Sequence, residues 1–132
     1  MMNRREHLGA MLAMAAALLP AGQLQALEAR MEELVPEYGL IGQMLALPGK
    51  RAELVAILGE GTGAMPGNMG YLIGEDSANP DAIWIVELWE TKAAHAASLG
   101  LPAVQEAIRK GRPLIAGFGT RAEFKPVAKT IK

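Results

Sequence analysis

The run "AIWIVELWE", from Ala82 to Glu90, most constrains the fold of this 132-residue chain. Side chains of a β-strand alternate between the two faces of the sheet, so Glu87 and Trp89 would share one face with Ile83 and Ile85. The other face would carry three large apolar side chains (Trp84, Val86 and Leu88). A strand that is apolar on both faces is usually covered on both. The run therefore predicts a sheet with helices on one face and another apolar layer on the other.

The order of the predicted elements indicates an α+β fold. Apolar periodicity and the turn residues between segments predict strand, helix, strand, strand, helix, strand, which is the ferredoxin-like βαββαβ plan. The predicted strands are 38–47, 69–76, 82–90 and 117–127, and the predicted helical segments are 50–58, 91–99 and 102–110. Short helices can cover one side of such a sheet, so we expect a second copy of the chain on the other. The prediction is a homodimer with the two sheets packed face to face.

Composition excludes several classes of function. The net charge is −1, with 13 basic and 14 acidic residues, so no nucleic-acid partner is expected. Without cysteine there is no disulfide, catalytic thiolate or cysteine metal site. The glycines of "GEGTGAMPG" (59–67) end a predicted helix and lack the spacing of a phosphate-binding loop. No hydrolase motif is present, and His95 alone outside the first residues offers no metal-ligand spacing, so we expect no metal.

The first residues have the order of an export signal. Arg4 and Arg5 precede an uncharged apolar run, 8–19, which is too short to cross a membrane. We predict a cleavable signal peptide over 1–26 that resembles twin-arginine signals, and therefore a periplasmic protein. A helix retained in the mature protein is the alternative, and a start at Met31 would leave the protein in the cytoplasm. Residues 27–37 are predicted as a helical spacer and 128–132 as a tail.

Three residues of different chemistry are expected to converge on one space. Glu87 and Trp89 should point toward the helices, and His95 lies one turn into the helix that follows. Tyr71, in the middle of the preceding strand, could join them, although the sequence does not fix its face. The alternative is purely structural, with Trp89 in the core and Glu87 paired with an arginine.

Residues 38–127 resemble the antibiotic biosynthesis monooxygenase family, and its small quinol-monooxygenase-like members in particular. The most specific stretch is "ExWxxxxxH", formed by Glu87, Trp89 and His95 and preceded by "PG" at 66–67 and by Tyr71. The stretches "YGLIGQMLALPGKRAELVAIL", "PAVQEAIRKGRPLI" and "FGTRAEFKPV" extend the likeness. The resemblance implies a dimeric α+β barrel.

The resemblance also implies an activity. Some members of the family oxygenate phenolic or quinol substrates with O2 and without flavin, haem or metal. By this hypothesis His95 is the base or a proton relay, and Glu87 orients it or binds a substrate hydroxyl. Trp89 and Ile85 would contact the substrate, and Tyr71 would donate a hydrogen bond to it. The alternative is a non-catalytic dimer that binds an apolar aromatic ligand.

The chain also departs from the family pattern. Cofactor-free members of the family carry an asparagine on the same strand face where this chain has Ile85, and often a tyrosine where it has His95. Haem-degrading relatives use an axial histidine where this chain has Leu99, and a first-strand asparagine where it has Gly42. Haem degradation is therefore not expected.

Overall fold

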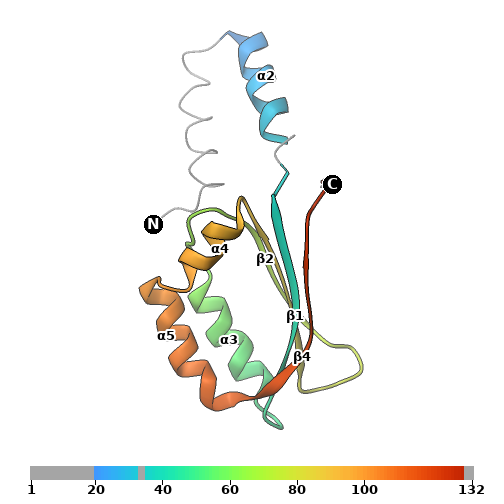
Figure 1. Ribbon diagram of the computed structural model, residues 1–132, viewed down its shortest axis with the longest axis vertical. Coiled ribbons are helices and arrows are strands. Elements are labelled where there is room, and N and C mark those ends of the chain that lie inside the picture. Colours follow the sequence, from blue (N-terminus) through green and yellow to red (C-terminus); the bar gives the residue numbers. More distant parts are fainter. Residues whose placement is uncertain (1–19, 33–34, 130–132) are drawn as a thin grey trace.

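The computed structural model of the chain describes residues 20–32 and 35–129 (Figure 1). Its elements are α2 (Ala21–Glu32), β1 (Tyr38–Ala46), α3 (Arg51–Gly61), β2 (Asn68–Glu75), β3 (Ala82–Trp89), α4 (Lys92–Ser98), α5 (Pro102–Gly111), the 3₁₀ turn η1 (Arg112–Leu114) and β4 (Ile115–Phe124). The strands form one antiparallel sheet in the order β2-β3-β1-β4. This arrangement is the ferredoxin-like α+β fold, so the predicted fold class is confirmed. The four-stranded sheet of the single chain is open at its edges.

Local signals in the sequence account for where several of the helices and strands begin. The Thr91 side chain accepts a hydrogen bond from the backbone N–H of Ala94 and so caps α4. Pro102 begins α5, where a missing N–H costs nothing. The last strand begins at Ile115, two residues earlier than predicted, because the η1 turn at Pro113 reverses the chain within three residues.

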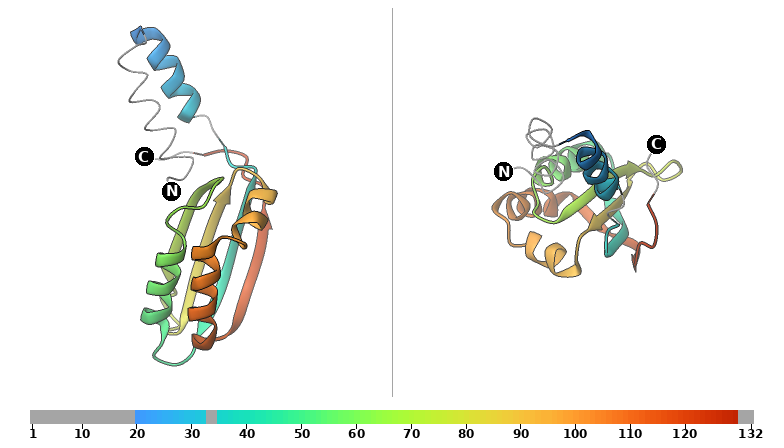
Figure 2. Two further views of the ribbon diagram at one scale, coloured as in Figure 1. Left: turned by 90° about the vertical axis from the view of Figure 1, so that its left-hand side faces the viewer. Right: turned by 90° about the horizontal axis from the view of Figure 1, so that it is seen from above.

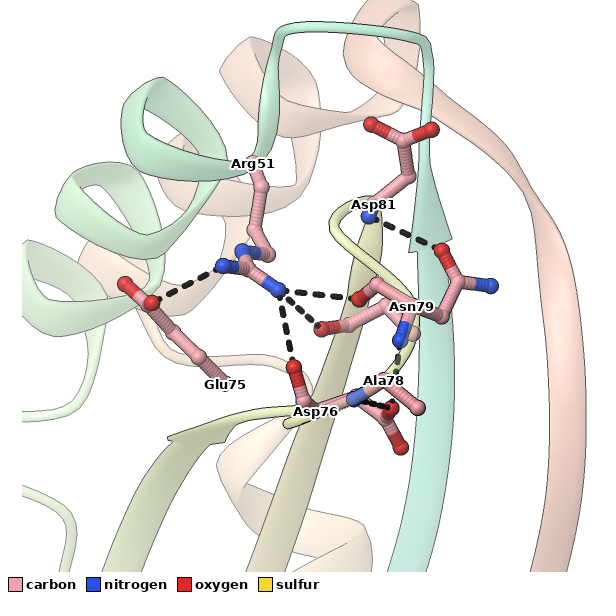
Figure 3. Close-up of polar contacts among 7 residues, drawn as sticks. Arg51, Glu75, Asp76, Ala78, Asn79 and Asp81 are labelled. Atoms are coloured by element: carbon pink, nitrogen blue, oxygen red, sulfur yellow. Dashed lines mark hydrogen bonds and ion pairs between the residues drawn. The ribbon is translucent and has the colours of Figure 1, made fainter.

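The loop between β2 and β3 is held to the start of α3 by Arg51 (Figure 3). One guanidinium nitrogen donates to the backbone oxygens of Asp76, Asn79 and Ala82 at 3.0–3.4 Å, and the other lies 2.9 Å from a Glu75 carboxylate oxygen. Arg51 therefore fixes the hairpin at the end of the molecule away from α4, which leaves it a structural role.

The helices α3 and α5 lie on one face of the sheet (Figure 2). Two groups of buried residues fill the space between: one is Tyr38, Leu40, Met65 and Trp89, and the other is Ala46, Leu54 and Ile83. The two helices approach closely at Gly61, where an added Cβ would lie 2.5 Å from the Cβ of Ala107. Side chains at the predicted helix-facing positions of β3 thus point into this layer.

The other face of the sheet, called the outer face below, is apolar. One row of directly paired residues crosses all four strands: Leu72, Val86, Ile41 and Ala122. Leu72 is 64% exposed, and the ring of Phe124 on β4 covers Gly39. In the part of the chain that the structure describes, no helix lies on this face (Figure 2). The homodimer expected to cover the outer face with a second copy stays a prediction.

The predicted signal peptide falls mainly on residues 1–19, which lie outside the described residues. Helix α2 spans Ala21–Glu32 and so runs through Ala26, the predicted cleavage point, and into the predicted spacer. Among the described residues, no helix is long and apolar enough to span a membrane.

Candidate active site

A cavity of about 620 Å³ lies between the sheet and the helices. Its walls come from all four strands and from α3, α4 and α5. Most of the lining is aliphatic, with Met44, Leu54, Leu58, Ile85, Val104, Ile108 and Ile115 among the residues that form it. A cavity of this size fits a drug-sized molecule and exceeds what a single-ring phenol needs.

Glu87 supplies the carboxylate of the cavity. Its side chain is only 13% exposed, and its Oε1 accepts a hydrogen bond of 3.1 Å from the Trp89 indole N–H. Burial raises the pKa of Glu87 above its ordinary value, although the indole N–H and positive charge on His95 and Arg121 oppose that rise. A carboxylate with a raised pKa is suited to accept a proton near neutral pH.

His95 faces Glu87 from α4. Its Nε2 lies 4.0 Å from Glu87 Oε1, and its side chain is 16% exposed. The imidazole ring lies between two aromatic rings, with centroid distances of 5.5 Å to both Tyr38 and Trp89. These rings restrict the orientations of the imidazole, and its Nε2 lies beyond hydrogen-bond distance from the carboxylate.

Tyr71 completes the polar end of the cavity. In the pairing of β2 with β3 it stands directly opposite Glu87, which settles the face that the sequence left open. Burial, and then the negative charge of Glu87, raise the pKa of the Tyr71 phenol far above its ordinary value of 10.0. The hydroxyl therefore remains a hydrogen-bond donor. Among the described residues none forms a hydrogen bond with this hydroxyl, which leaves it available to a ligand in the cavity.

The structure places the five predicted site residues in two layers. Tyr71, Ile85, Glu87 and His95 line the cavity together. Trp89 is fully buried behind them and is not part of the lining. Its contact with the cavity is indirect, through the hydrogen bond to Glu87. The roles proposed for these residues stay predictions.

Sequence reasoning missed Tyr38 and the role of Ser98. Tyr38 begins β1, packs on His95 and donates a hydrogen bond of 3.1 Å to Glu123. Ser98 donates to the backbone oxygen of His95 at 2.6 Å, so its hydroxyl does not pair with the imidazole. Only the strand pairing brings Tyr38 opposite Trp89, and no local pattern marks that contact.

Among the described residues, no three His, Asp or Glu side chains are grouped closely enough to hold a metal ion together. The arrangement as it stands offers a buried carboxylate, an imidazole and a phenol donor at one end of an apolar cavity. Such a set can bind a hydroxylated aromatic ring, take its proton and hold the resulting anion away from water.

Comparisons with known proteins agree with the fold and name a family. Residues 37–110 match the model of the antibiotic biosynthesis monooxygenase family. A search of curated proteins found no match. Among solved structures, the chain is similar to a candidate antibiotic biosynthesis monooxygenase from Chloroflexus aurantiacus J-10-fl, with 52% sequence identity and a TM-score of 0.69. The match covers 70% of this chain and 95% of that one.

Two more distant structures share the fold. A candidate antibiotic biosynthesis monooxygenase from Deinococcus radiodurans is 24% identical, with a TM-score of 0.58 over 72% of this chain and 96% of that one. One from Caulobacter crescentus CB15 is 16% identical, with a TM-score of 0.61 over 76% and 99% of the two chains.

Proposed function

The chain belongs to the antibiotic biosynthesis monooxygenase family, and on that premise we propose that it is a monooxygenase that oxidises a quinol or polycyclic phenol with O2. We propose further that it needs no flavin, haem or metal. The observation that carries the proposal is the position of Glu87, His95 and Tyr71 at one end of a large apolar cavity.

The chemistry requires little of the protein beyond proton transfer and binding. The substrate hydroxyl gives its proton to the Glu87–His95 pair, and the electron-rich anion passes one electron to O2. The two radicals combine to a peroxide anion at a ring carbon. The Glu87–His95 pair returns its proton to give the hydroperoxide, and loss of water leaves a quinone. One oxygen atom of O2 ends in the product and the other in water. Tyr71 would donate a hydrogen bond to the substrate oxygen, and the apolar walls would exclude water from the intermediates.

We also propose that the functional unit is a homodimer. The outer face carries an uninterrupted apolar row from Leu72 to Ala122, and no described helix covers it. An exposed apolar face of a sheet is typical of an interaction site, and a second copy related by a two-fold axis presents the same apolar face.

Export through the twin-arginine route is a further part of the proposal. It rests on Arg4, Arg5 and the apolar run 8–19. When the full chain is produced in a Gram-negative host, we expect the periplasmic form to lack about the first 26 residues by mass spectrometry. Replacing both arginines with lysine should keep the protein inside. A full-length protein confined to the cytoplasm in both cases would contradict export.

Oxygen consumption tests the proposed activity directly. Purified protein treated with a chelator should increase the rate of O2 uptake with a panel of reduced quinols and anthrones above the spontaneous rate. His95→Ala should lower the enzymatic kcat/KM by about 10²-fold, the usual contribution of an acid–base group. Trp89→Phe removes the hydrogen-bond donor to Glu87 and should lower kcat while shifting the pH profile upward.

Ala97→Ser on the exposed side of α4 serves as the control and should keep wild-type activity. Uptake that requires added flavin or metal would contradict the cofactor-independent part of the proposal. No uptake with any substrate, while aromatic ligands still bind, would replace the oxygenase with a binding module.

A further inference from the structure

The cavity extends along the sheet from the catalytic groups to the start of β4. Glu87 pairs with Leu40 of β1, whereas Ile115 pairs with Ala46. Along β1, Leu40 and Ala46 are six residues apart, which corresponds to about 20 Å at roughly 3.3 Å per residue. Figure 2 shows α5 running down the sheet from α4, with the chain turning into β4 at its lower end. The lining includes residues at both levels, so the cavity is elongated.

The polar groups of the lining gather at its two ends. Tyr71, Glu87 and His95 form one end, and Arg112 is the single arginine or lysine among the described residues that line the cavity. The hydroxyls of Thr62 and Ser98 are taken up by backbone oxygens of the protein. Between the ends the wall is almost entirely aliphatic.

Arg112 differs from the neighbouring cations on α5. Arg109 pairs with Glu106, and Lys110 pairs with Glu60. In the described part of the chain, the guanidinium of Arg112 has neither a hydrogen bond nor an ion pair. A cation at the C-terminal end of a helix is favourable by itself, which is the simplest reason for an arginine here. Arg112 is also exposed to solvent, and it borders the apolar cavity at its rim.

We propose that Arg112 forms an anion-binding subsite at the end of the cavity opposite Glu87 and His95. The substrate is then an elongated apolar molecule with a phenolic hydroxyl at one end and a carboxylate at the other. The planar guanidinium suits a carboxylate because it can donate two parallel hydrogen bonds. The orientation of the substrate rests on the proposed function, because it assigns the reacting hydroxyl to the Glu87 end.

Matched probes test the subsite by binding alone. We would measure the affinity of the full-length protein for hydroxynaphthyl-hexanoic acid and for its methyl ester by fluorescence titration. The acid should bind about five- to tenfold tighter than the ester at low salt, and this preference should shrink as salt screens the charge. Hydroxynaphthyl acids with a shorter alkyl chain should lose this preference for the acid over the ester, because their carboxylate no longer reaches the far end of the cavity.

Variants assign the preference to one residue. Arg112→Gln should abolish it and Arg112→Lys should retain part of it. Arg109→Gln, one turn earlier on α5 and outside the lining, should leave it intact. Naphthol should bind wild type and Arg112→Gln equally. Equal binding of acid and ester, no binding of either, or a preference that survives in Arg112→Gln would overturn the subsite.

Oxygen uptake separates this inference from the proposed activity. If the preference depends on Arg112 but no probe or quinol supports O2 uptake, the subsite stands and the oxygenase fails. If quinols are oxidised but the acid binds no tighter than its methyl ester, the oxygenase stands and the subsite is overturned.

Discussion

Replacing Glu87 with glutamine is expected to lower kcat/KM for O2 uptake by about 10²–10⁴-fold, because glutamine cannot accept the substrate proton. The amide oxygen can still accept the Trp89 N–H, so the buried indole keeps its partner. The geometry of the cavity should therefore change little. Kinetics with a quinol that the wild type oxidises would measure the loss.

The same substitution should stabilise the protein at neutral pH. Burial raises the pKa of Glu87, so the folded state binds this proton more tightly than the unfolded state does. The stability that the group contributes is complete below the ordinary glutamate range and is lost as the pH rises through the raised pKa. Glu87→Gln avoids that loss. We expect the free energy of unfolding to increase by about 0.5–2 kcal/mol at pH 7, the usual size of a stabilising single substitution.

Urea unfolding of both proteins over a pH series checks the sign. The gain should vanish at acidic pH, where Glu87 is protonated in both states. Glu106→Gln is the matched control, because its pairing with Arg109 lowers the pKa of that exposed carboxylate. This control should show no gain and full activity. A Glu87→Gln protein that is both fully active and no more stable would remove Glu87 from the proposed chemistry.

Local patterns in the sequence were sufficient to predict the helix-facing side of β3. Alternation placed Glu87 and Trp89 on one face, and the predicted helical segment 91–99 placed His95 one turn into the following helix. Each of these inferences depends on neighbours within a few residues. That is why they could be drawn without knowing how the strands pair.

The depth of each residue in the site depends on contacts that no local pattern encodes. The sequence did not show that Trp89 lies behind the cavity lining, where Tyr38 from β1 and His95 from α4 pack on it and Glu87 accepts its N–H. The face of Tyr71 became known only through its pairing with Glu87. Arg112 contributes to the lining because η1 turns the chain at the end of α5, and a basic residue at a helix end gives no sign of this.

Val86→Asp on the outer face is expected to convert the proposed dimer to a monomer. Val86 lies in the central row of that face, between Leu72 of β2 and Ile41 of β1. At a sheet-to-sheet interface an aspartate there would be buried without a partner, and the symmetry would bury it twice. An unpaired buried charge costs about 3–5 kcal/mol, which corresponds to at least roughly a 10²-fold rise in the dissociation constant.

The substitution should separate assembly from folding, because Val86 points away from the helix-covered core that contains Ile83 and Trp89. Circular dichroism of the variant should therefore match the wild type, while sedimentation reports a monomer. Ala52→Asp, on the exposed first turn of α3, adds the same charge to the helix side and should leave the dimer intact. If wild type and Val86→Asp sediment alike, the outer face is not the dimer interface. If Ala52→Asp also dissociates the protein, the helix side takes part in assembly.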